Sequence, residues 1–386
     1  MPCRGLRPLL LGLFLTGGHC SLIAATYAVG TCLPQYVSFS TIQSAVSSVP
    51  AGSMIKVCSG TYFEQVTITQ PLTLEGVAVS NIERAVITMP PEGFLVNANL
   101  QTLGQLVAAG ILVQNVSPPG PVNLSNLTVD GANVNLGCDP YHGIAGIVYA
   151  TGASGTLQRL TTRNQTSSGC SFGIAAENPA SSPTQLITIE HNSVHDEDGT
   201  GIFVGDTLYT TPSTTVTIIG NVVAAIPTPS GPIYYSGDIW VQDVNGTVAG
   251  NLITGGSFGI YGDAAGVSLS HNRLADFLPT GLATAISLTA GETAESNQIS
   301  NSYMGIYGAA NATITGNLIM NTAYAIVYNC LTNTVNGNTI NDTQVAYYQP
   351  PSGVSAANTL TNVDTIVGGS CPAAPLKRPD FHFRRH

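Results

Sequence analysis

The sequence concentrates its chemically capable side chains in the run His195-Asp196-Glu197-Asp198. Two carboxyl groups about 6.5–9.5 Å apart can hydrolyse a glycosidic bond, one as the acid and the other as the base, and a histidine beside them can hold the site. We therefore predict His195, Glu197 and Asp198 as catalytic residues. A turn explains Asp196 equally well, because Asp or Asn recurs at this place in later copies of a repeat.

A second group of chemically capable residues follows the sequence Asp-Pro-Tyr-His at 139–142. It is similar to the Asp-Pro-His of alginate epimerases and lyases, with a tyrosine inserted. Epimerisation or β-elimination of a uronate needs a base, a proton donor and a cation that neutralises the carboxylate. The residues nearby with that chemistry, predicted to bind substrate, are Tyr141, His142, Arg159 and Arg163. A turn beside Cys138 is the alternative.

A third group is acidic and follows the second strand of successive repeats, at Glu177, Asp206, Asp243 and Asp263. Carboxylates on stacked repeats repel one another unless they are protonated or bridged by a cation, and Ca²⁺ prefers such oxygen ligands. Asp206, Asp243 and Asp263 are accordingly predicted as calcium ligands, and no other cofactor is indicated. Side chains that point into water from recurring turns are the alternative.

Aromatic side chains could provide a surface on which sugar rings stack. Tyr261 and Tyr307 each follow a Gly-Ile pair, so strand alternation places them on the face opposite the isoleucines. The whole set is Tyr234, Tyr235, Trp240, Tyr261, Tyr307, Tyr324, Tyr328, Tyr347 and Tyr348. A stack that only stabilises the fold is the alternative.

The composition excludes several classes of protein. Only 8% of the 386 residues are Asp, Glu, Lys or Arg, against roughly 25% in an ordinary soluble domain. Long amphipathic helices need such residues on their solvent faces, so a mostly helical protein is excluded. The formal net charge of −10 argues against nucleic acid or an anionic membrane surface as the partner.

The N-terminus has the layout of a cleavable signal peptide over residues 1–25, in which Arg4 and Arg7 precede an apolar run too short to span a bilayer. We therefore expect a secreted protein, extracellular or periplasmic. Cysteines pair in such oxidising compartments. The simplest pairing of the remaining six joins neighbours in sequence, as Cys32–Cys58, Cys138–Cys170 and Cys330–Cys371, although other connectivities are open.

A repeat organises the whole chain: a short alternating strand, an asparagine, a turn, and a Gly-Ile pair that opens another strand. The recurring asparagines, 20 to 30 residues apart, are Asn192, Asn221, Asn251, Asn272, Asn297, Asn317 and Asn338. Short strands at this period, with no helical pattern, predict an all-β fold in which each repeat is one coil of a parallel β-helix. Coils stacked about 4.8 Å apart would align isoleucines in interior columns and asparagines in a hydrogen-bonded ladder.

Residues 40–49 break this pattern, because their apolar side chains have helical spacing after a Ser/Thr cap and Pro50 ends the run. We predict a short helix that covers the open N-terminal end of the solenoid. The expected organisation is an N-terminal cap and first strands over 26–76, β-helix repeats over 77–349, and a closing segment with a basic tail over 350–386.

The residues after this helix carry a resemblance to a known group. Residues 55–68, Ile-Lys-Val-Cys-Ser-Gly-Thr-Tyr-Phe-Glu-Gln-Val-Thr-Ile, and 72–76, Leu-Thr-Leu-Glu-Gly, resemble the start of secreted right-handed parallel β-helix proteins of the pectin-lyase-like superfamily. The Gly-Ile and Asn repeats are similar to those of NosD-like periplasmic proteins. The resemblance implies a right-handed single β-helix over roughly residues 30–345. It implies no single activity, because the superfamily includes lyases, hydrolases, esterases, epimerases and adhesins. The pectin methylesterase motifs are absent, so Glu64 is expected to be structural.

These observations favour a secreted β-helix protein that binds or processes an extracellular polysaccharide, by lyase-like or hydrolase-like chemistry. The alternative is a non-catalytic surface, matrix or adhesin-like protein. The expected partner is a polysaccharide or cell-surface glycan, with no nucleic acid and no membrane span, and the chain is expected to be a monomer.

Overall fold

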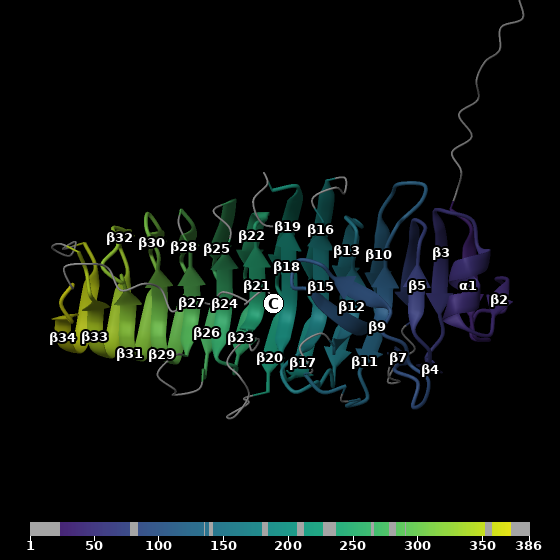
Figure 1. Ribbon diagram of the computed structural model, residues 1–386, viewed down its shortest axis with the longest axis horizontal. Helices are drawn as coiled ribbons and strands as arrows, with labels where there is room; N and C mark the ends of the chain where they lie inside the picture. Colours follow the sequence, from purple (N-terminus) through teal and green to yellow (C-terminus); the bar gives the residue numbers. More distant parts are fainter. Residues whose placement is uncertain are drawn as a thin grey trace, which may run out of the picture.

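The computed structural model describes residues 24–77, 84–134, 136–138, 142–179, 184–206, 212–226, 237–263, 266–277, 283–289, 291–351 and 357–371. Almost all of the predicted signal peptide and most of the predicted basic tail therefore lie outside the described residues. The strands stand side by side along the long axis, from helix α1 (Ile42–Ser48) at one end to β34 (Thr359–Gly368) at the other (Figure 1). In the described part of the chain, no helix is long and apolar enough to cross a membrane.

The strands form two long sheets whose pairings are parallel, except for β8 with β9. The sheet of 13 strands has the order β2 (Ser38–Phe39), β1 (Thr26–Val29), β3 (Ser53–Val57), β6 (Leu72–Gly76), β10 (Val122–Ser125), β13 (Gly155–Gln158), β16 (Gln185–Glu190), β19 (Thr214–Ile219), β22 (Asn245–Ala249), β25 (Gly266–Ser270), β28 (Thr293–Glu295), β30 (Thr313–Thr315) and β32 (Thr334–Asn336). The second sheet contains, in chain order, β4 (Gly60–Phe63), β5 (Val66–Ile68), β7 (Ala85–Thr88), β8 (Ala98–Leu100), β9 (Gln105–Val113), β11 (Thr128–Asp130), β12 (His142–Tyr149), β14 (Thr161–Arg163), β15 (Ser171–Asn178), β17 (Ser193–Glu197), β18 (Thr200–Asp206), β20 (Val222–Ala225), β21 (Gly237–Gln242), β23 (Leu252–Thr254), β24 (Phe258–Asp263), β26 (Arg273–Ala275), β27 (Thr284–Leu288), β29 (Gln298–Gly308), β31 (Leu318–Val327), β33 (Thr339–Tyr348) and β34. Each strand pairs with its counterpart one repeat away, which confirms the predicted parallel β-helix.

The interior of the coils is lined by columns of identical apolar residues. One fully buried column consists of Ile111, Ile147, Ile174, Ile202, Ile239, Ile260, Ile286, Ile306 and Ile326. These side chains belong to one continuous hydrophobic cluster. The predicted interior isoleucine column is confirmed.

Most of these isoleucines follow a glycine at a close approach between coils, whereas Asp238, Ala285 and Ala325 take that place in three coils. A Cβ on Gly146 would lie 2.6 Å from the carbonyl oxygen of Gly173, and one on Gly173 would lie 2.7 Å from that of Gly201. Real Cβ atoms do not come this close to an oxygen. The recurring Gly-Ile pair therefore allows one coil to approach the next.

The predicted asparagine ladder is present and extends one coil further, to Asn358. Each amide nitrogen donates to the Oδ1 of the next ladder asparagine, as Asn221 does to Asn251 at 3.0 Å, and to a strand carbonyl, as Asn221 does to Ile189 at 2.9 Å. The residue before each asparagine from Asn192 to Asn338 adopts positive φ, which explains why Gly220 and Gly250 occupy that place.

Helix α1 lies at the N-terminal end of the stack, as predicted. The Thr41 side chain accepts from the Ser44 amide, and the Glu64 carboxylate accepts from the amides of Ile42 and Gln43 at 2.8 and 2.9 Å. The expectation that Glu64 is structural is thus confirmed. The apolar face of the helix is buried against the first coil.

All three predicted disulfides are present, joining Cys32 to Cys58, Cys138 to Cys170 and Cys330 to Cys371. The repeats run further than the predicted end at residue 349, because β34 pairs with β33 along its whole length. The two prolines at 350 and 351 lie in the connection between these strands, outside the sheet, so they do not end the stack.

Candidate functional site

The structure separates the side chains of the predicted catalytic run His195, Glu197 and Asp198. Asp196 has φ 60°, the left-handed conformation that later copies of the turn share at Asp276, Asn301 and Asp342. Its neighbour His195 is 35% exposed and lies 2.7 Å from an Asp196 oxygen, whereas Glu197 is only 1% exposed. The turn interpretation of Asp196 is confirmed, and Glu197 does not share a surface with His195.

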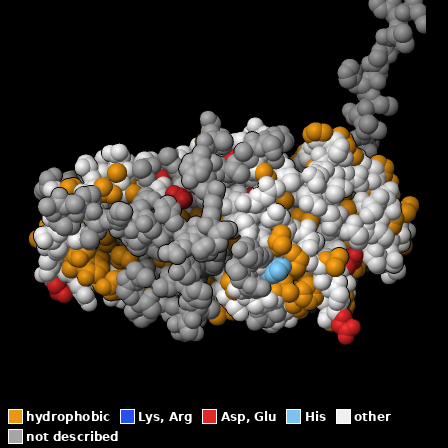
Figure 2. Space-filling view, in the orientation of Figure 1, with side chains coloured by type: hydrophobic (Ala, Val, Ile, Leu, Met, Phe, Trp, Pro, Cys, Tyr) orange, Lys and Arg blue, Asp and Glu red, His pale blue; other side chains and the backbone are white. Residues whose placement is uncertain are grey.

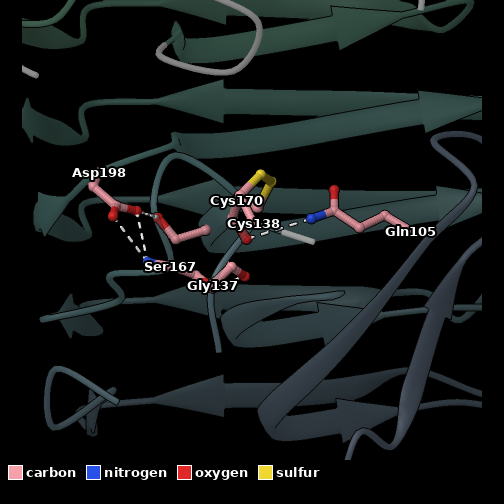
Figure 3. The surroundings of a disulfide bond; sticks show 7 residues. Gln105, Gly137, Cys138, Ser167, Cys170 and Asp198 are labelled. Atoms are coloured by element: carbon pink, nitrogen blue, oxygen red, sulfur yellow. Dashed lines mark hydrogen bonds between the residues drawn. A yellow bond between two sulfur atoms is a disulfide. The ribbon is translucent and has the colours of Figure 1, made fainter. Parts of the chain in front are cut away.

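The Asp198 carboxylate is held by structural hydrogen bonds (Figure 3). Both oxygens accept from the Ser167 amide at 2.9 to 3.0 Å, and one accepts from the Ser171 hydroxyl at 2.7 Å. The Cys138–Cys170 disulfide lies beside them. Asp198 therefore ties the 167–171 loop to the coil that follows it.

His195 instead has Arg163 beside it, directly in register on the neighbouring strand β14. The Arg163 Nε lies 2.7 Å from an oxygen of Asp130, one strand further along. Burial alone would raise the pKa of Asp130, but hydrogen bonds from Asn164, Arg163 and the Ala132 amide hold it below its ordinary value. Asp130, Arg163 and His195 thus form a charged stripe on three successive coils.

The other predicted substrate-binding residues do not join this stripe. Arg159 is exposed at a different corner, where its guanidinium donates to the Gln158 side chain at 2.8 Å. His142 opens β12 and pairs with Leu106. Tyr141 lies outside the described residues. The structure therefore brings Arg163 to His195 but leaves Arg159 apart.

The predicted acidic column is not a single row. Glu177 is in register with Gly205, Gln242 and Asp263, whereas Asp206 and Asp243 lie one residue further along their strands. The four acids follow the start of their Gly-Ile strands by either four or five residues. A difference of one residue along a strand turns the side chain to the opposite face. The acidic residues therefore differ in their surroundings.

Two of the four carboxylates serve structural contacts. Glu177 is buried and accepts from the amides of Gln101 and Thr102 at 3.0 Å. One Asp206 oxygen accepts from the amides of Ser213 and Thr214, and also from the Ser213 hydroxyl. Both acids fasten loops to the sheet.

Asp243 has a different environment. Burial raises its pKa to about 6, and the negative charges of Asp263 and Asp206 add to the effect. Its Oδ2 is buried without a hydrogen-bond partner, and its backbone amide donates to the Asp263 carbonyl at 2.8 Å. Within the described residues, no group of three or more His, Cys, Asp or Glu is arranged to hold a metal ion. The calcium site at Asp206, Asp243 and Asp263 stays a prediction.

A row of aromatic rings crosses the same strands. Phe203 and Trp240 have ring centroids 5.0 Å apart, and Trp240 and Tyr261 have centroids 5.9 Å apart. Phe203 and Trp240 are 0% and 6% exposed, so only Tyr261 at the end of the row has appreciable exposure. Asp263 follows Tyr261 by two residues and points to the same face of β24. Asp243 comes directly after β21 and has φ 50°, so strand alternation does not set the direction of its side chain, and the charge of Asp263 acts on its carboxyl group. We call Trp240, Tyr261, Asp263 and this neighbouring Asp243 the acidic–aromatic face.

The remaining predicted aromatic residues have mixed positions. Tyr307 lies on the outer face as expected, and Tyr324 and Tyr348 stack with centroids 4.7 Å apart. Tyr328 and Tyr347 are 6% and 1% exposed and belong to the core, so neither can form a sugar platform. Tyr234 and Tyr235 lie outside the described residues.

The described part of the face seen in Figure 2 is poor in charge. Figure 2 shows mostly apolar and uncharged polar side chains on the visible face, with few acidic ones among them. Sequence reasoning had separated the aromatic residues from the acids. The signal that joins them is the strand register, in which Trp240 pairs with Tyr261 and Gln242 pairs with Asp263.

One buried carboxyl group, Asp238, escaped the sequence analysis, which also did not predict the burial of the candidate catalytic residue Glu197. Asp238 occupies the glycine place of a Gly-Ile pair, is fully buried, and has one oxygen 3.2 Å from the Ala225 amide. Burial raises the pKa of Asp238 well above its ordinary value. Burial likewise raises the pKa of Glu197, and the charges of Asp198 and Asp196 raise it further.

Comparison with known proteins supports the architecture. The family model for the right-handed β-helix region matches residues 206–365. No curated protein matches the sequence. Among solved structures, the tailspike of an E. coli bacteriophage in complex with a hexasaccharide is 12% identical, with a TM-score of 0.55, over 88% of this chain and 65% of that one. A GH136 lacto-N-biosidase from Eubacterium ramulus is 9% identical, with a TM-score of 0.51, over 87% of this chain and 68% of that one.

This chain therefore spans about two thirds of the length of those two proteins. Identities this low establish the fold alone. Together with the parallel pairing between successive coils, they show that this chain has a parallel β-helix fold, and its residues 206–365 match the right-handed β-helix family model.

Proposed function

We propose that this protein binds an extracellular polysaccharide on the acidic–aromatic face and hydrolyses a glycosidic bond there. The observation that carries the proposal is the Asp243 carboxyl, whose pKa is raised to about 6 beside a second carboxyl group at Asp263. Paired carboxyl groups whose surroundings give them different proton affinities divide naturally into an acid and a base.

In this reaction Asp243 protonates the oxygen of the leaving sugar, because its raised pKa keeps a proton available near neutral pH. Asp263 then acts as the carboxylate that activates water or stabilises the positive charge on the sugar ring. Tyr261 offers a partly exposed ring on which a sugar can stack, and the buried Trp240 behind it holds that ring in place.

Two further observations support a role on glycans outside the cell. A bacteriophage tailspike solved with a hexasaccharide and a lacto-N-biosidase have the same fold as this chain. Three disulfides fit an oxidising compartment, in agreement with the signal-like N-terminus. We propose accordingly that the protein is secreted.

The test is a screen of the chain from residue 26 onward against neutral and uronate-containing polysaccharides, with new reducing ends as the readout. Asp243→Asn should lower turnover at least about 100-fold and leave binding intact. Tyr261→Ala should weaken binding by about tenfold. The control Tyr348→Ala alters an aromatic residue of the same outer column at the far end of the solenoid. Unchanged turnover in Asp243→Asn would exclude this mechanism.

The charged stripe favours a second candidate, β-elimination or epimerisation of a uronate. Arg163 could neutralise the carboxylate of the sugar, and His195, oriented by Asp196, could remove the proton beside it. Epimerisation cleaves no bond and would be followed by the uronate composition. Elimination leaves a new reducing end and an unsaturated sugar without added water, so the ultraviolet absorbance of that sugar, read in the same screen, distinguishes it from hydrolysis. His195→Gln would abolish that product. Binding with no cleavage and no change in uronate composition would favour a non-catalytic surface or matrix protein.

A further inference from the structure

The interior of the solenoid contains an unusual group of polar side chains at the coils of β14 and β17. Thr162, Gln165 and Glu197 are 0%, 0% and 1% exposed. Thr162 stands in a column otherwise formed by apolar residues, between Val129 and Val194. We call these three residues the internal polar group.

The backbone directs Glu197 and Gln165 into the same space. Each follows a residue of positive φ, Asp196 at 60° and Asn164 at 60°, and the Asp198 amide donates to the Gln165 carbonyl at 3.3 Å. Gln165 and Glu197 therefore take equivalent places on adjacent coils. Adjacent coils are separated by about 4.8 Å, which places the two side chains next to each other.

The glycine column provides the room for these side chains. A Cβ on Gly146 would lie 2.9 Å from the Gln165 amide nitrogen, and one on Gly173 would lie 2.9 Å from the Thr162 hydroxyl oxygen. The carbonyl oxygen of Gly201 comes within 2.7 Å of that second position. The Thr162 hydroxyl oxygen and the Gly201 carbonyl oxygen thus face this interior space, and the Gln165 amide nitrogen beside Gly146 donates to the Val129 carbonyl at 3.2 Å.

Four oxygen atoms of the internal polar group are buried without a hydrogen bond of ordinary geometry: the Thr162 hydroxyl, the Gln165 amide oxygen and both Glu197 carboxylate oxygens. The Thr162 hydroxyl nevertheless lies close enough to Glu197 to lower its pKa. Burying an ionised carboxylate without a partner costs several kcal/mol, so such groups are normally paired or bind a metal. Asp130, Asp196 and Asp198 add negative charge close to Glu197. Their combined field attracts a cation and repels an anion.

We propose that Glu197, Thr162 and Gln165 bind a hard, oxygen-liganded cation inside the coil stack, either Na⁺ or Ca²⁺. A cation accounts for oxygens that face one another without hydrogen bonds, because ligands at about 2.3–2.6 Å from an ion remain separated from each other by more than a hydrogen-bond length. A proton on Glu197, whose pKa is raised by burial, is the competing explanation, and an unfolding midpoint that ignores both ions would favour it. The site is independent of the acidic–aromatic face.

The experiment measures thermal unfolding of protein purified in chelator and exchanged into choline chloride. In one arm NaCl is added in the presence of chelator, and in the other CaCl₂ is added without chelator, both at constant ionic strength. The ion that binds should raise the unfolding midpoint by a few degrees, and the other should not. Binding of Ca²⁺ would also give about one calcium per chain by elemental analysis. The arm that responds identifies the ion.

Glu197→Gln should abolish the ion-dependent shift, and Thr162→Val should reduce it while restoring the apolar column. Thr322→Val is the matched control. Thr322 is also buried and shares a hydrogen bond with Thr343, and this pair lies several coils away from Glu197. This variant should keep the full shift. A wild-type midpoint that ignores both ions would overturn the proposal. So would Glu197→Gln retaining the full shift.

Discussion

The buried asparagine ladder makes a quantitative prediction at Asn251. Its Nδ2 donates to the Ile218 carbonyl at 3.0 Å and to Asn272 Oδ1 at 2.9 Å, and its Oδ1 accepts from the amide and the side chain of Asn221 at 2.9 and 3.0 Å. Asn251→Ala removes all four bonds. At about 1 kcal/mol each, the free energy of unfolding should fall by about 4 kcal/mol. That is a large share of the total stability of a typical domain.

The assay is urea unfolding followed by far-UV circular dichroism, with Asn301→Gly as the matched control. Asn301 belongs to an exposed ladder, donating to Asp276 and accepting from Asn321, each at 2.7 Å. Glycine keeps its positive φ of 54°, so the control should change stability by less than about 0.5 kcal/mol. Equal losses in the two variants would refute the idea that burial gives the inner ladder its strength.

Four other outcomes are expected. The kcat/KM should fall about tenfold per pH unit above pH 6, because Asp243 has a pKa of about 6 and only its protonated form is the acid. The folded state also binds this proton more tightly than an unfolded chain, in which the pKa is 3.8, so the free energy of unfolding should fall as the pH rises from about 4 to 6. In denaturation curves measured over this range, Asp243→Asn should show a smaller fall. Asp238→Ala should raise the melting temperature at pH 8, since Ala285 and Ala325 occupy the same place in other coils and no carboxylate is then buried; a lower melting temperature would contradict this. Glu64→Gln should cost about 1–2 kcal/mol in urea unfolding by weakening the bonds to Ile42 and Gln43, and a neutral result would show that Thr41 caps the helix alone.

The sequence predicted the parts of the fold in which the same residue recurs at the same place. Because stacked coils place identical residues next to one another, the isoleucine column and the Asn192–Asn338 ladder could be predicted from the sequence. The capping helix was predictable because its apolar side chains recur with the 3.6-residue period of a helix, whereas those of the surrounding strands recur at every second residue. The cysteines could be paired because each pair spans one or two coils.

The site was less predictable, because turns redirect side chains. Strand alternation would place His195 and Glu197 on one face, since they are two residues apart. The left-handed Asp196 between them lies at an irregularity of β17, where the register with β20 shifts between His195 and Glu197, so one side chain is partly exposed and the other is buried. The charged stripe and the acidic–aromatic face likewise depend on register between coils, which the unequal repeat lengths hide in the sequence.

The spacing of the ladder has a consequence for how such a protein can change over evolutionary time. The last ladder asparagines, Asn297, Asn317, Asn338 and Asn358, are 20, 21 and 20 residues apart and make the same bonds. Loss or duplication of one such unit leaves every remaining donor opposite an equivalent acceptor. The C-terminal part of the rod can therefore lengthen or shorten by whole coils, while the chemistry borne by the irregular coils before Asn297 stays unaltered.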